Sequence, residues 1–441
     1  MRDGSFEYEK TEDGVILTEF VPETDPSGSL TLPALLGGQP VREIGTNAFS
    51  SHGSEITSLT VPEGVRRIDG GAFTWMLMLE QLNLPESLVS LEEGFSAGTS
   101  LSGLRIPRGV RRIGGVGSLP FRLCFEPGNP VWSTDGYGIF RKSPEGLILA
   151  ATDPESRAVR YRVPDGVTCI EEDAFSGREF LEELVLPASL QDIREGALSN
   201  IANMYSDRKG IRSVTFPDGN RLFHAEEDYL SRGDVLLRWF GENRCVQVPD
   251  GISTIAAECF YRCAAQEILL PPSVRTIHQR ALVLCQAERV YIGADGLNIL
   301  FPDGGTYLQD KLMEAFGQNG KRYDFTFYDR SLLTGLLDPV KARMLLSRLS
   351  MQSDVAAGLD EKTAEKMRSA LSARLPDLFA TAAVSGDFDT VRLLADWDGM
   401  TESDFEDAIR IMQEHGRTEM MTCLMRRKLE SIGGDGFDFS L

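Results

Sequence analysis

The clearest pattern in the chain is a short alternation of apolar and polar residues that ends at a proline. In Leu59-Thr-Val-Pro62 the apolar side chains fall at alternate positions, which predicts a short β-strand with one buried face. The prolines at positions 62, 85 and 107 are 23 and 22 residues apart. A period of about 20 to 50 residues is typical of a solenoid. The same unit recurs at residues 59–62, 82–85, 104–107, 161–164, 184–187, 214–217, 246–249 and 268–271.

A second element of the repeat follows each of these strands. In the first full copy it is Val65-Arg-Arg-Ile68 and then a small turn that carries an aromatic residue, Phe73. Because one repeat cannot bury its apolar face alone, we expect these aromatic residues to form a file in the core. Members of the file are Phe49, Phe73, Phe95, Phe175 and Phe260, with Leu198 and Leu282 at the same point of two other repeats. The stretch Gly114–Gly117 has no aromatic residue, so we expect a looser turn there.

The first 29 residues show a different pattern, with two alternating runs around Phe6–Tyr8 and Val15–Phe20. A turn at Thr11–Gly14 separates the runs, which predicts a hairpin. A solenoid needs a cover on its first repeat, so we interpret this hairpin as the cap. Regular repeats are then expected from Leu30 to Leu123.

Two longer intervals interrupt the repeats, from Ile113 to Ile170 and from Ile193 to Ile255. Each contains strand-like runs joined by a turn, which predicts a hairpin inserted at one edge of the solenoid. The aromatic residues of these insertions are candidate partner contacts, although they also suit packing of the hairpin onto its neighbour. The candidates are Trp132, Tyr137, Tyr229 and Trp239. The outward residues Thr60, Asn83 and Arg105 are further candidates, because they would form a ladder on the exposed face of the sheet.

The period changes from strand to helix after about residue 305. Residues 311–316, 338–349 and 361–371 carry apolar side chains at helical spacing, and Asp338 before Pro339 is a suitable N-cap. Residues 381–394 align with 411–424 at an offset of 30, which predicts two stacked helix pairs. The expected domains are a capping hairpin (1–29), a solenoid (30–305), a helical region (306–375), helix pairs (376–430) and a disordered tail (431–441).

The repeat resembles the BspA-type (treponemal) leucine-rich repeat of bacteria, with the pattern L-x-x-L-x-I-P-x-x-V-x-x-I-G-x-x-A-F-x-x-C. Residues 66–73 and 161–175 fit it closely, and Cys263 stands where the repeat has its cysteine. Residues 376–428 resemble a degenerate ankyrin repeat, which keeps Gly386 and Leu394 but lacks the T-P-L-H opening. The resemblance implies an α+β chain in which a β-rich leucine-rich-repeat solenoid precedes an all-α, ankyrin-like region. Both families are modules that hold other proteins.

Composition and charge narrow the choice of partners. The formal net charge is −21 and no basic stripe is visible, so nucleic acid and anionic membranes are disfavoured as partners. The N-terminus has no signal-like apolar segment, and no run of 18 apolar residues occurs, which favours a cytoplasmic protein. The seven cysteines are odd in number and sparse for 441 residues, and most occupy apolar repeat positions. Such cysteines are typical of buried thiols in a reducing compartment, so a disulfide framework is not expected.

A search for reactive motifs gives no candidate active site. Cys259, Cys263, His278 and Cys285 could be read as a zinc set, but Cys263 and Cys285 are one repeat apart and are expected to stack as core residues. No nucleophile elbow, phosphate loop or zinc-protease motif is present. The sequence therefore predicts a non-enzymatic scaffold, without metal or cofactor, that binds a protein or peptide through its sheet and insertion hairpins. The alternative is a cell-surface or secreted adhesin that binds host protein or glycan.

Overall fold

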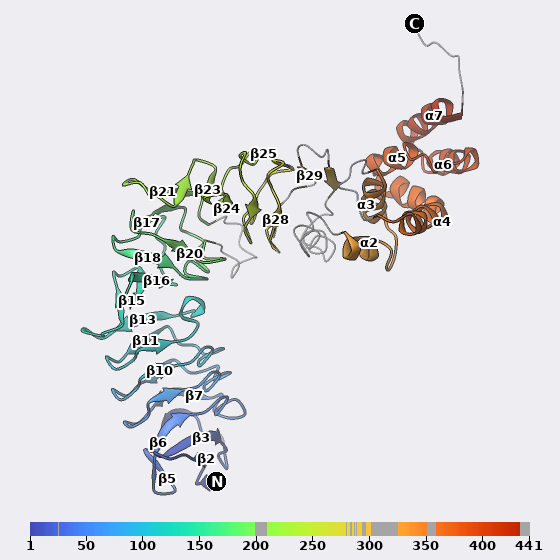
Figure 1. Cartoon of the computed structure of the whole chain (residues 1–441). Coiled ribbons are helices and arrows are strands. Elements are labelled where there is room, and N and C mark those ends of the chain that lie inside the picture. The colour runs from blue at the N-terminus through green and yellow to red at the C-terminus, as the bar shows by residue number, and fades with distance from the viewer. Residues whose placement is uncertain are drawn as a thin grey trace. The chain divides into compact units, whose positions relative to one another are not determined.

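The computed structural model divides into two compact units, residues 1–225 and 226–441. It describes residues 1–24, 26–198, 210–278, 280–282, 285, 287, 289–292, 297–300, 325–350 and 359–432. The predicted helix at 311–316 and the predicted tail beyond residue 432 lie outside the described residues. Both units contain turns of a β-solenoid, and the second also contains the helices (Figure 1).

The first unit is built from short strands. They are β1 (Arg2–Asp3), β2 (Phe6–Lys10), β3 (Val15–Phe20), β4 (Gly28–Thr31), β5 (Leu35–Leu36), β6 (Gln39–Ile44), β7 (Ile56–Thr60), β8 (Arg67–Ile68), β9 (Gln81–Asn83), β10 (Ser90–Leu91), β11 (Gly103–Ile106), β12 (Arg112–Ile113), β13 (Arg122–Phe125), β14 (Trp132–Thr134), β15 (Gly138–Ser143), β16 (Gly146–Thr152), β17 (Arg160–Arg162), β18 (Val167–Ile170), β19 (Glu183–Val185), β20 (Asp192–Ile193), β21 (Ser213–Thr215) and β22 (Phe223–Ala225). A 3₁₀ turn, η1, covers Val116–Ser118.

The predicted hairpin at the N-terminus is confirmed. Strands β2 and β3 pair antiparallel, and the amide of Thr11 donates to the carbonyl of Gly14 across the turn. Strand β3 then pairs in parallel with β6, which in turn pairs with β8 of the next repeat. The hairpin therefore continues the sheet at the start of the solenoid.

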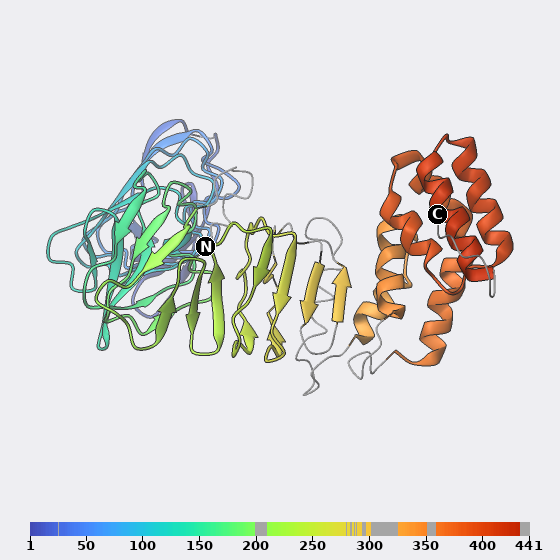
Figure 2. The same ribbon diagram turned by 90° about the horizontal axis from the view of Figure 1, so that it is seen from above.

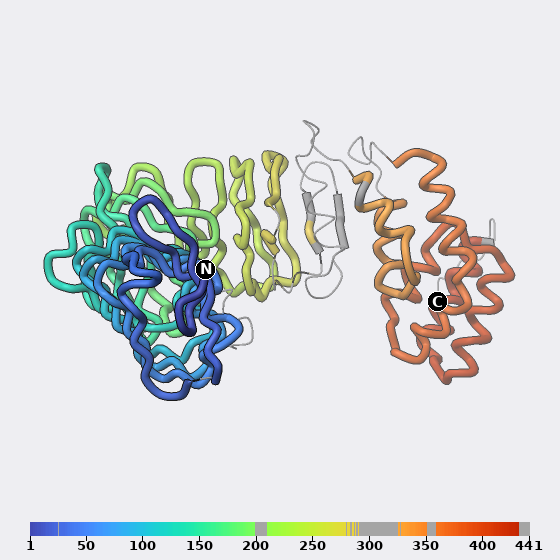
Figure 3. Tube along the Cα trace, turned by 90° about the horizontal axis from the view of Figure 1, so that it is seen from below, coloured from blue at the N-terminus to red at the C-terminus, as the bar shows by residue number. Residues whose placement is uncertain are grey.

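Two columns of parallel strands run through the regular repeats. One contains β6, β8, β10 and β12, and the other contains β4, β7 and β9. The register places Leu59 beside Leu82, both buried, and Thr60 beside Asn83. Because equivalent residues face one another, the period of the sequence becomes the stacking period of the turns, visible as stacked coils in Figure 3.

The aromatic file lies in the core as predicted. Phe49, Phe73, Phe95, Phe175 and Phe260 are each at most 1% exposed. In the first unit, the ring centroids of Phe49 and Phe73 are 5.6 Å apart. At the repeat without an aromatic residue in its turn, Phe121 is buried and contacts Phe95 edge to face. A residue four positions after Gly117 thus supplies the ring that the turn lacks.

The second unit continues with strands β23 to β30, drawn in yellow-green to yellow in Figure 2. Strands β23 and β24 form the predicted second insertion hairpin. Parallel pairing then joins β24, β26 and β28 in one sheet and β25, β27 and β29 in another. Their bounds are β23 (Tyr229–Arg232), β24 (Val235–Trp239), β25 (Cys245–Gln247), β26 (Thr254–Ile255), β27 (Glu267–Leu270), β28 (Thr276–Ile277), β29 (Arg289–Ile292) and β30 (Leu297–Leu300).

The C-terminal part is helical. Asp338 caps α3 through its carboxylate, which accepts from the amide of Lys341, as predicted. The helices are α2 (Thr326–Leu332), α3 (Pro339–Leu349), α4 (Glu361–Ser385), α5 (Phe388–Ala395), α6 (Glu402–Glu414) and α7 (Thr418–Ile432).

The two predicted helix pairs are α4–α5 and α6–α7. Gly386 and Gly416 adopt left-handed backbone conformations at the two turns. Arg417 ties the pairs together, because its guanidinium donates to the carbonyls of Ala383 and Val384 at the end of α4. Helix α4 is longer than predicted and passes through Pro376, which is exposed. The carbonyl that loses its amide donor there can bond to water instead.

Candidate interaction surface

The outward residues of the strand column form the ladder that the sequence predicts. The Nδ2 amide of Asn83 donates a hydrogen bond of 3.2 Å to the Oγ1 of Thr60, one repeat earlier. Arg105 occupies the same position on β11, and its guanidinium pairs with the carboxylate of Glu126. The side chain of Arg105 is 78% exposed, so most of this group faces solvent. We call Thr60, Asn83 and Arg105 the strand ladder.

A charged column follows the other series of strands. The Nε of Arg67 lies 2.6 Å from an oxygen of Asp69 and 3.6 Å from one of Glu92. Arg112 on the next repeat reaches Glu92 at 3.2 Å. Burial, and then the neighbouring carboxyl of Asp69, raise the pKa of Glu43 to about 6. Acidic and basic groups thus alternate along this column, and most of its charges already have partners.

Trp132, a candidate contact in the first insertion, is buried. The ring is 3% exposed, stacks on Phe125 at 6.0 Å, and donates from Nε1 to the carbonyl of Arg111. Asn129 fixes this arrangement, because its Oδ1 accepts from the amides of Val131 and Trp132. The Nδ2 of Asn129 donates to the preceding repeat. These contacts support the packing interpretation of Trp132.

The start of the second insertion repeats this arrangement. Asn220 accepts from the amides of Leu222 and Phe223 and donates to Leu190, while Phe223 stacks on Phe216 at 5.9 Å. In both insertions a phenylalanine is followed four positions later by the asparagine of a Gly-Asn pair. An aromatic residue then stands three positions after that asparagine. Sequence reasoning noted the two insertions as counterparts but missed this Asn cap. The signal was present in the spacing of residues 125–132 and 216–223.

Tyr137 is half-buried in a polar cluster. Its ring centroid lies 4.2 Å from that of Tyr161, whose hydroxyl donates to Asp135 at 2.8 Å. Burial raises the pKa of Tyr137 to about 12 and, with the Asp135 hydrogen bond, raises that of Tyr161 further. Neither phenol ionises near neutral pH, so this cluster offers hydrogen bonds rather than acid–base chemistry.

The two aromatic candidates of the second insertion contact each other. Tyr229 is half-buried and stacks on Trp239 with ring centroids 5.9 Å apart. Trp239 itself is 6% exposed and packs on Phe260. Of the four aromatic candidates, the two tyrosines keep part of their surface in solvent and the two tryptophans do not.

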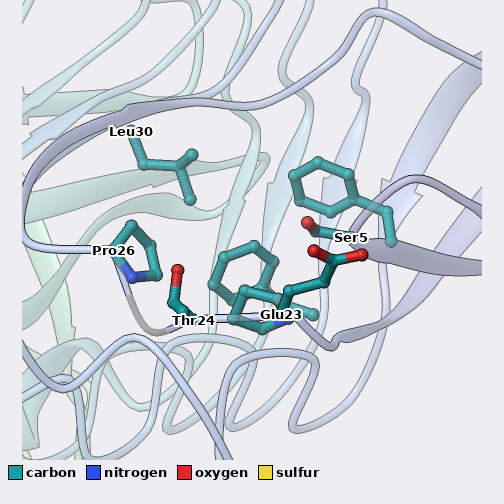
Figure 4. Close-up of a pocket in the computed structure, with 8 residues that line it drawn as sticks. Ser5, Glu23, Thr24, Pro26 and Leu30 are labelled. Atoms are coloured by element: carbon teal, nitrogen blue, oxygen red, sulfur yellow. The ribbon is translucent and has the colours of Figure 1, made fainter.

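A shallow hollow of about 290 Å³ lies beside the capping hairpin. Phe6, Phe20 and Leu30 give it an apolar base, and Glu23 places a carboxylate at its edge. Figure 4 shows Ser5, Glu23, Thr24, Pro26 and Leu30 around the opening. Among the described residues that line the hollow, Glu23 is the single titratable side chain.

Three cysteines of the possible zinc set lie in the core of the second unit. Cys259, Cys263 and Cys285 are all buried in one apolar cluster, as the repeat spacing predicts. Contact with Cys263 and burial raise the pKa of Cys285, and burial raises that of Cys259. The part of the chain that the structure describes holds no group of three acidic, histidine or cysteine side chains arranged for a metal ion. Within the same residues, every helix is too short or too polar to span a bilayer.

Comparison with known proteins gives one family match. Six copies of the family described as "BspA type Leucine rich repeat region" match residues 31–117, 157–219 and 242–300. No curated protein matches the chain.

Several solved structures are similar. A leucine-rich cell surface protein from Faecalibacterium prausnitzii is 18% identical, over 67% of this chain and 94% of that one, with a TM-score of 0.38. The pneumococcal vaccine antigen PcpA is 15% identical over 66% and 69%, with a TM-score of 0.33. A leucine-rich repeat protein from Bacteroides capillosus is 26% identical over 29% and 97%, with a TM-score of 0.26.

Proposed function

Because the chain carries BspA-type leucine-rich repeats, we propose that it is a protein-binding solenoid that holds a protein or peptide on its strand ladder. The observation that carries the proposal is the register of β7 and β9, which places Thr60 beside Asn83 on an exposed face. Arg105 extends this face by one repeat. A preformed row of polar groups suits an extended partner, because little ordering entropy remains to be lost on binding.

The half-exposed tyrosines of the insertion hairpins, Tyr137 and Tyr229, are proposed as additional contacts. Tyrosine combines a large apolar ring with a hydroxyl, and it is enriched in protein interfaces. The matched family is a repeat of the protein-interaction kind and not a catalytic one. We therefore propose a scaffold role, with specificity set by the ladder and the hairpins together.

We further propose that the protein acts in the cytoplasm. None of the seven cysteines, all of which lie among the described residues, forms a disulfide, as expected of thiols in a reducing compartment. The formal charge of −21 disfavours nucleic acid and anionic membranes as partners and favours a protein with basic groups.

Affinity capture from the native host tests the scaffold role. The bait is the full chain, and the variant is Asn83→Ala with Arg105→Ala. A matched control replaces another exposed arginine and amide, Arg410→Ala with Gln413→Ala on α6. We expect the same partner with wild type and control, and at least tenfold less with the ladder variant at unchanged folding. Equal recovery with all three baits would refute the ladder as the binding face.

A further inference from the structure

One loop of the first unit exposes three large apolar side chains within four residues. Trp75 is 65% exposed, Leu77 is 54% exposed and Met78 is 51% exposed. Among the other described residues, the large exposed apolar side chains are isolated in the sequence, except Met425 and Leu429, which lie one turn apart on α7. Single ones need no explanation, but a contiguous apolar patch marks an interaction site. We call these three residues the Trp75 cluster.

The backbone holds the tryptophan outward at a position that favours glycine. Trp75 has φ +65°, in the left-handed region that bulky residues rarely adopt. Two residues after the file phenylalanine, the corresponding position is Gly177 in one later repeat, with φ +74°, and Arg262 in another, with φ +54°. Glycine would adopt this backbone conformation without strain, so the conformation does not explain why a tryptophan occupies the position. Such outliers persist where the exposed side chain has a use.

The loop is fixed by its neighbours. The amide of Trp75 donates to the carbonyl of Ala97 at 3.0 Å, and the Ser100 hydroxyl donates to the carbonyl of Leu77 at 2.6 Å. The indole lies against Gly98, where an added Cβ would come within 3.2 Å of the ring. The loop backbone and the indole are therefore positioned before any partner binds, which lowers the entropy cost of binding.

The rim of the cluster is acidic. The amide of Ile56 donates to the carbonyl of Gly53 and that of Leu79 to Met76, so Glu55 is the counterpart of Met78 one repeat earlier, and Glu80 follows Met78 by two residues. Glu55 and Glu80 are both exposed, and neither forms a salt bridge among the described residues. Two carboxylates without a cationic partner thus flank an apolar patch at the start of β9.

We propose that the Trp75 cluster anchors a basic amphipathic peptide segment of a partner protein. An aromatic or aliphatic side chain of the segment packs on Trp75, Leu77 and Met78, and its lysines or arginines pair with Glu55 and Glu80. A second copy of this chain is a poorer occupant, because its charge of −21 would set like charges against each other. The inference rests on the proposed protein-binding function and adds an anchor at the amino end of the ladder strands.

The test uses the full chain and a random dodecapeptide library displayed on phage. Trp75→Gly removes the ring and gives the turn its preferred residue, so this variant is expected to fold with equal or higher stability. Selected peptides should combine lysine or arginine with aromatic or aliphatic residues. Measured by fluorescence anisotropy, their dissociation constants should rise about 30-fold with Trp75→Gly, the loss typical of an interface hot spot. Glu55→Gln with Glu80→Gln should weaken binding and reduce its salt dependence.

The matched control is Arg262→Gly, which changes the equivalent left-handed turn in the second unit, at φ +54°. It should leave peptide binding unchanged. Four results overturn the inference: selected peptides without basic residues, no selected peptide at all, equal binding by Trp75→Gly, or a wild-type dimer that Trp75→Gly abolishes in sedimentation. If capture of the native partner still depends on Asn83 and Arg105 in any of these cases, the proposed function stands without this anchor.

Discussion

Asn83 and Thr60 occupy the same position in successive repeats and are joined by a hydrogen bond of 3.2 Å between Nδ2 and Oγ1. An exposed hydrogen bond of this kind contributes roughly 1 kcal/mol or less to folding, because water competes for both groups. The stability of the fold therefore does not depend on the strand ladder. The repeats are held together by their buried file, which leaves the ladder available for a partner.

The buried file gives the first stability prediction. Phe73→Ala should destabilise the first unit by about 3–5 kcal/mol, because it leaves a cavity against Phe49 in a fully buried layer. Phe73→Leu should cost roughly 1 kcal/mol, since Leu198 and Leu282 fill the same position in other repeats. Urea unfolding measures the loss of unfolding free energy in both variants. Similar losses for Phe73→Ala and Phe73→Leu would contradict the role of the aromatic file in the core.

The cap at the first insertion gives the second prediction. Asn129→Ala removes both the acceptor for two amides and the donor to Val110 at a site that is 4% exposed. We expect a loss of about 2–3 kcal/mol in the free energy of unfolding. Asn220→Ala, at the half-buried counterpart, should cost less. A larger loss at Asn220 would count against burial as the cause.

The charged column gives a pH-dependent prediction. The pKa of Glu43 is raised from 4.5 to about 6, so the folded chain binds this proton more tightly than the unfolded chain. The resulting stability is fully present below about pH 4.5 and is lost as the pH rises through 6. Glu43→Gln should thus be neutral at pH 4.5 and more stable than wild type at pH 7.5, by less than about 1 kcal/mol because the side chain is partly exposed. Thermal unfolding of the wild type and the variant at the two pH values tests this prediction. A Glu43→Gln variant that is less stable than the wild type at pH 7.5 would contradict the raised pKa of Glu43.

The buried ion pair of the helical region gives a fourth prediction. The Nε of Arg348 lies 2.7 Å from Asp329, both side chains are at most 5% exposed, and the guanidinium covers the ring of Phe325. Asp329→Asn should lower the free energy of unfolding by about 3–5 kcal/mol, because it removes the carboxylate that pairs with a buried guanidinium. Arg348→Met with Asp329→Leu should restore much of that loss. Circular dichroism during urea unfolding follows the helices, and a double variant as unstable as Asp329→Asn would argue against the charge explanation.

Sequence reasoning recovered the parts of the fold that repeat. The spacing of Pro62 and Pro85 is the register of β7 and β9, and the alternation at Phe6–Phe20 is the capping hairpin. The predicted helix at 361–371 is shorter than α4, which runs on through Pro376 to Ser385. The carbonyl that lacks an amide donor because of Pro376 can bond to water only if it is exposed. Its exposure depends on how α4 packs in the folded chain, and the local sequence does not show this.

The candidate contacts were harder to predict because an aromatic residue in an insertion serves packing and binding equally well. Trp132 was a candidate, yet the Asn129 cap and Phe125 hold it inside. Trp75 was not a candidate, because in the sequence it reads as one residue of an irregular turn. Its 65% exposure and its left-handed backbone are properties of the folded chain that the sequence does not show.

The most direct measurement places a photocrosslinking amino acid at position Asn83 of the full chain in the native host, and in a parallel strain at Gln413 on α6. The account predicts that illumination links a specific partner protein to position 83 and not to position 413. Crosslinking at 413 alone, or at neither position while the partner still co-purifies, would contradict the claim that the strand ladder is the binding face.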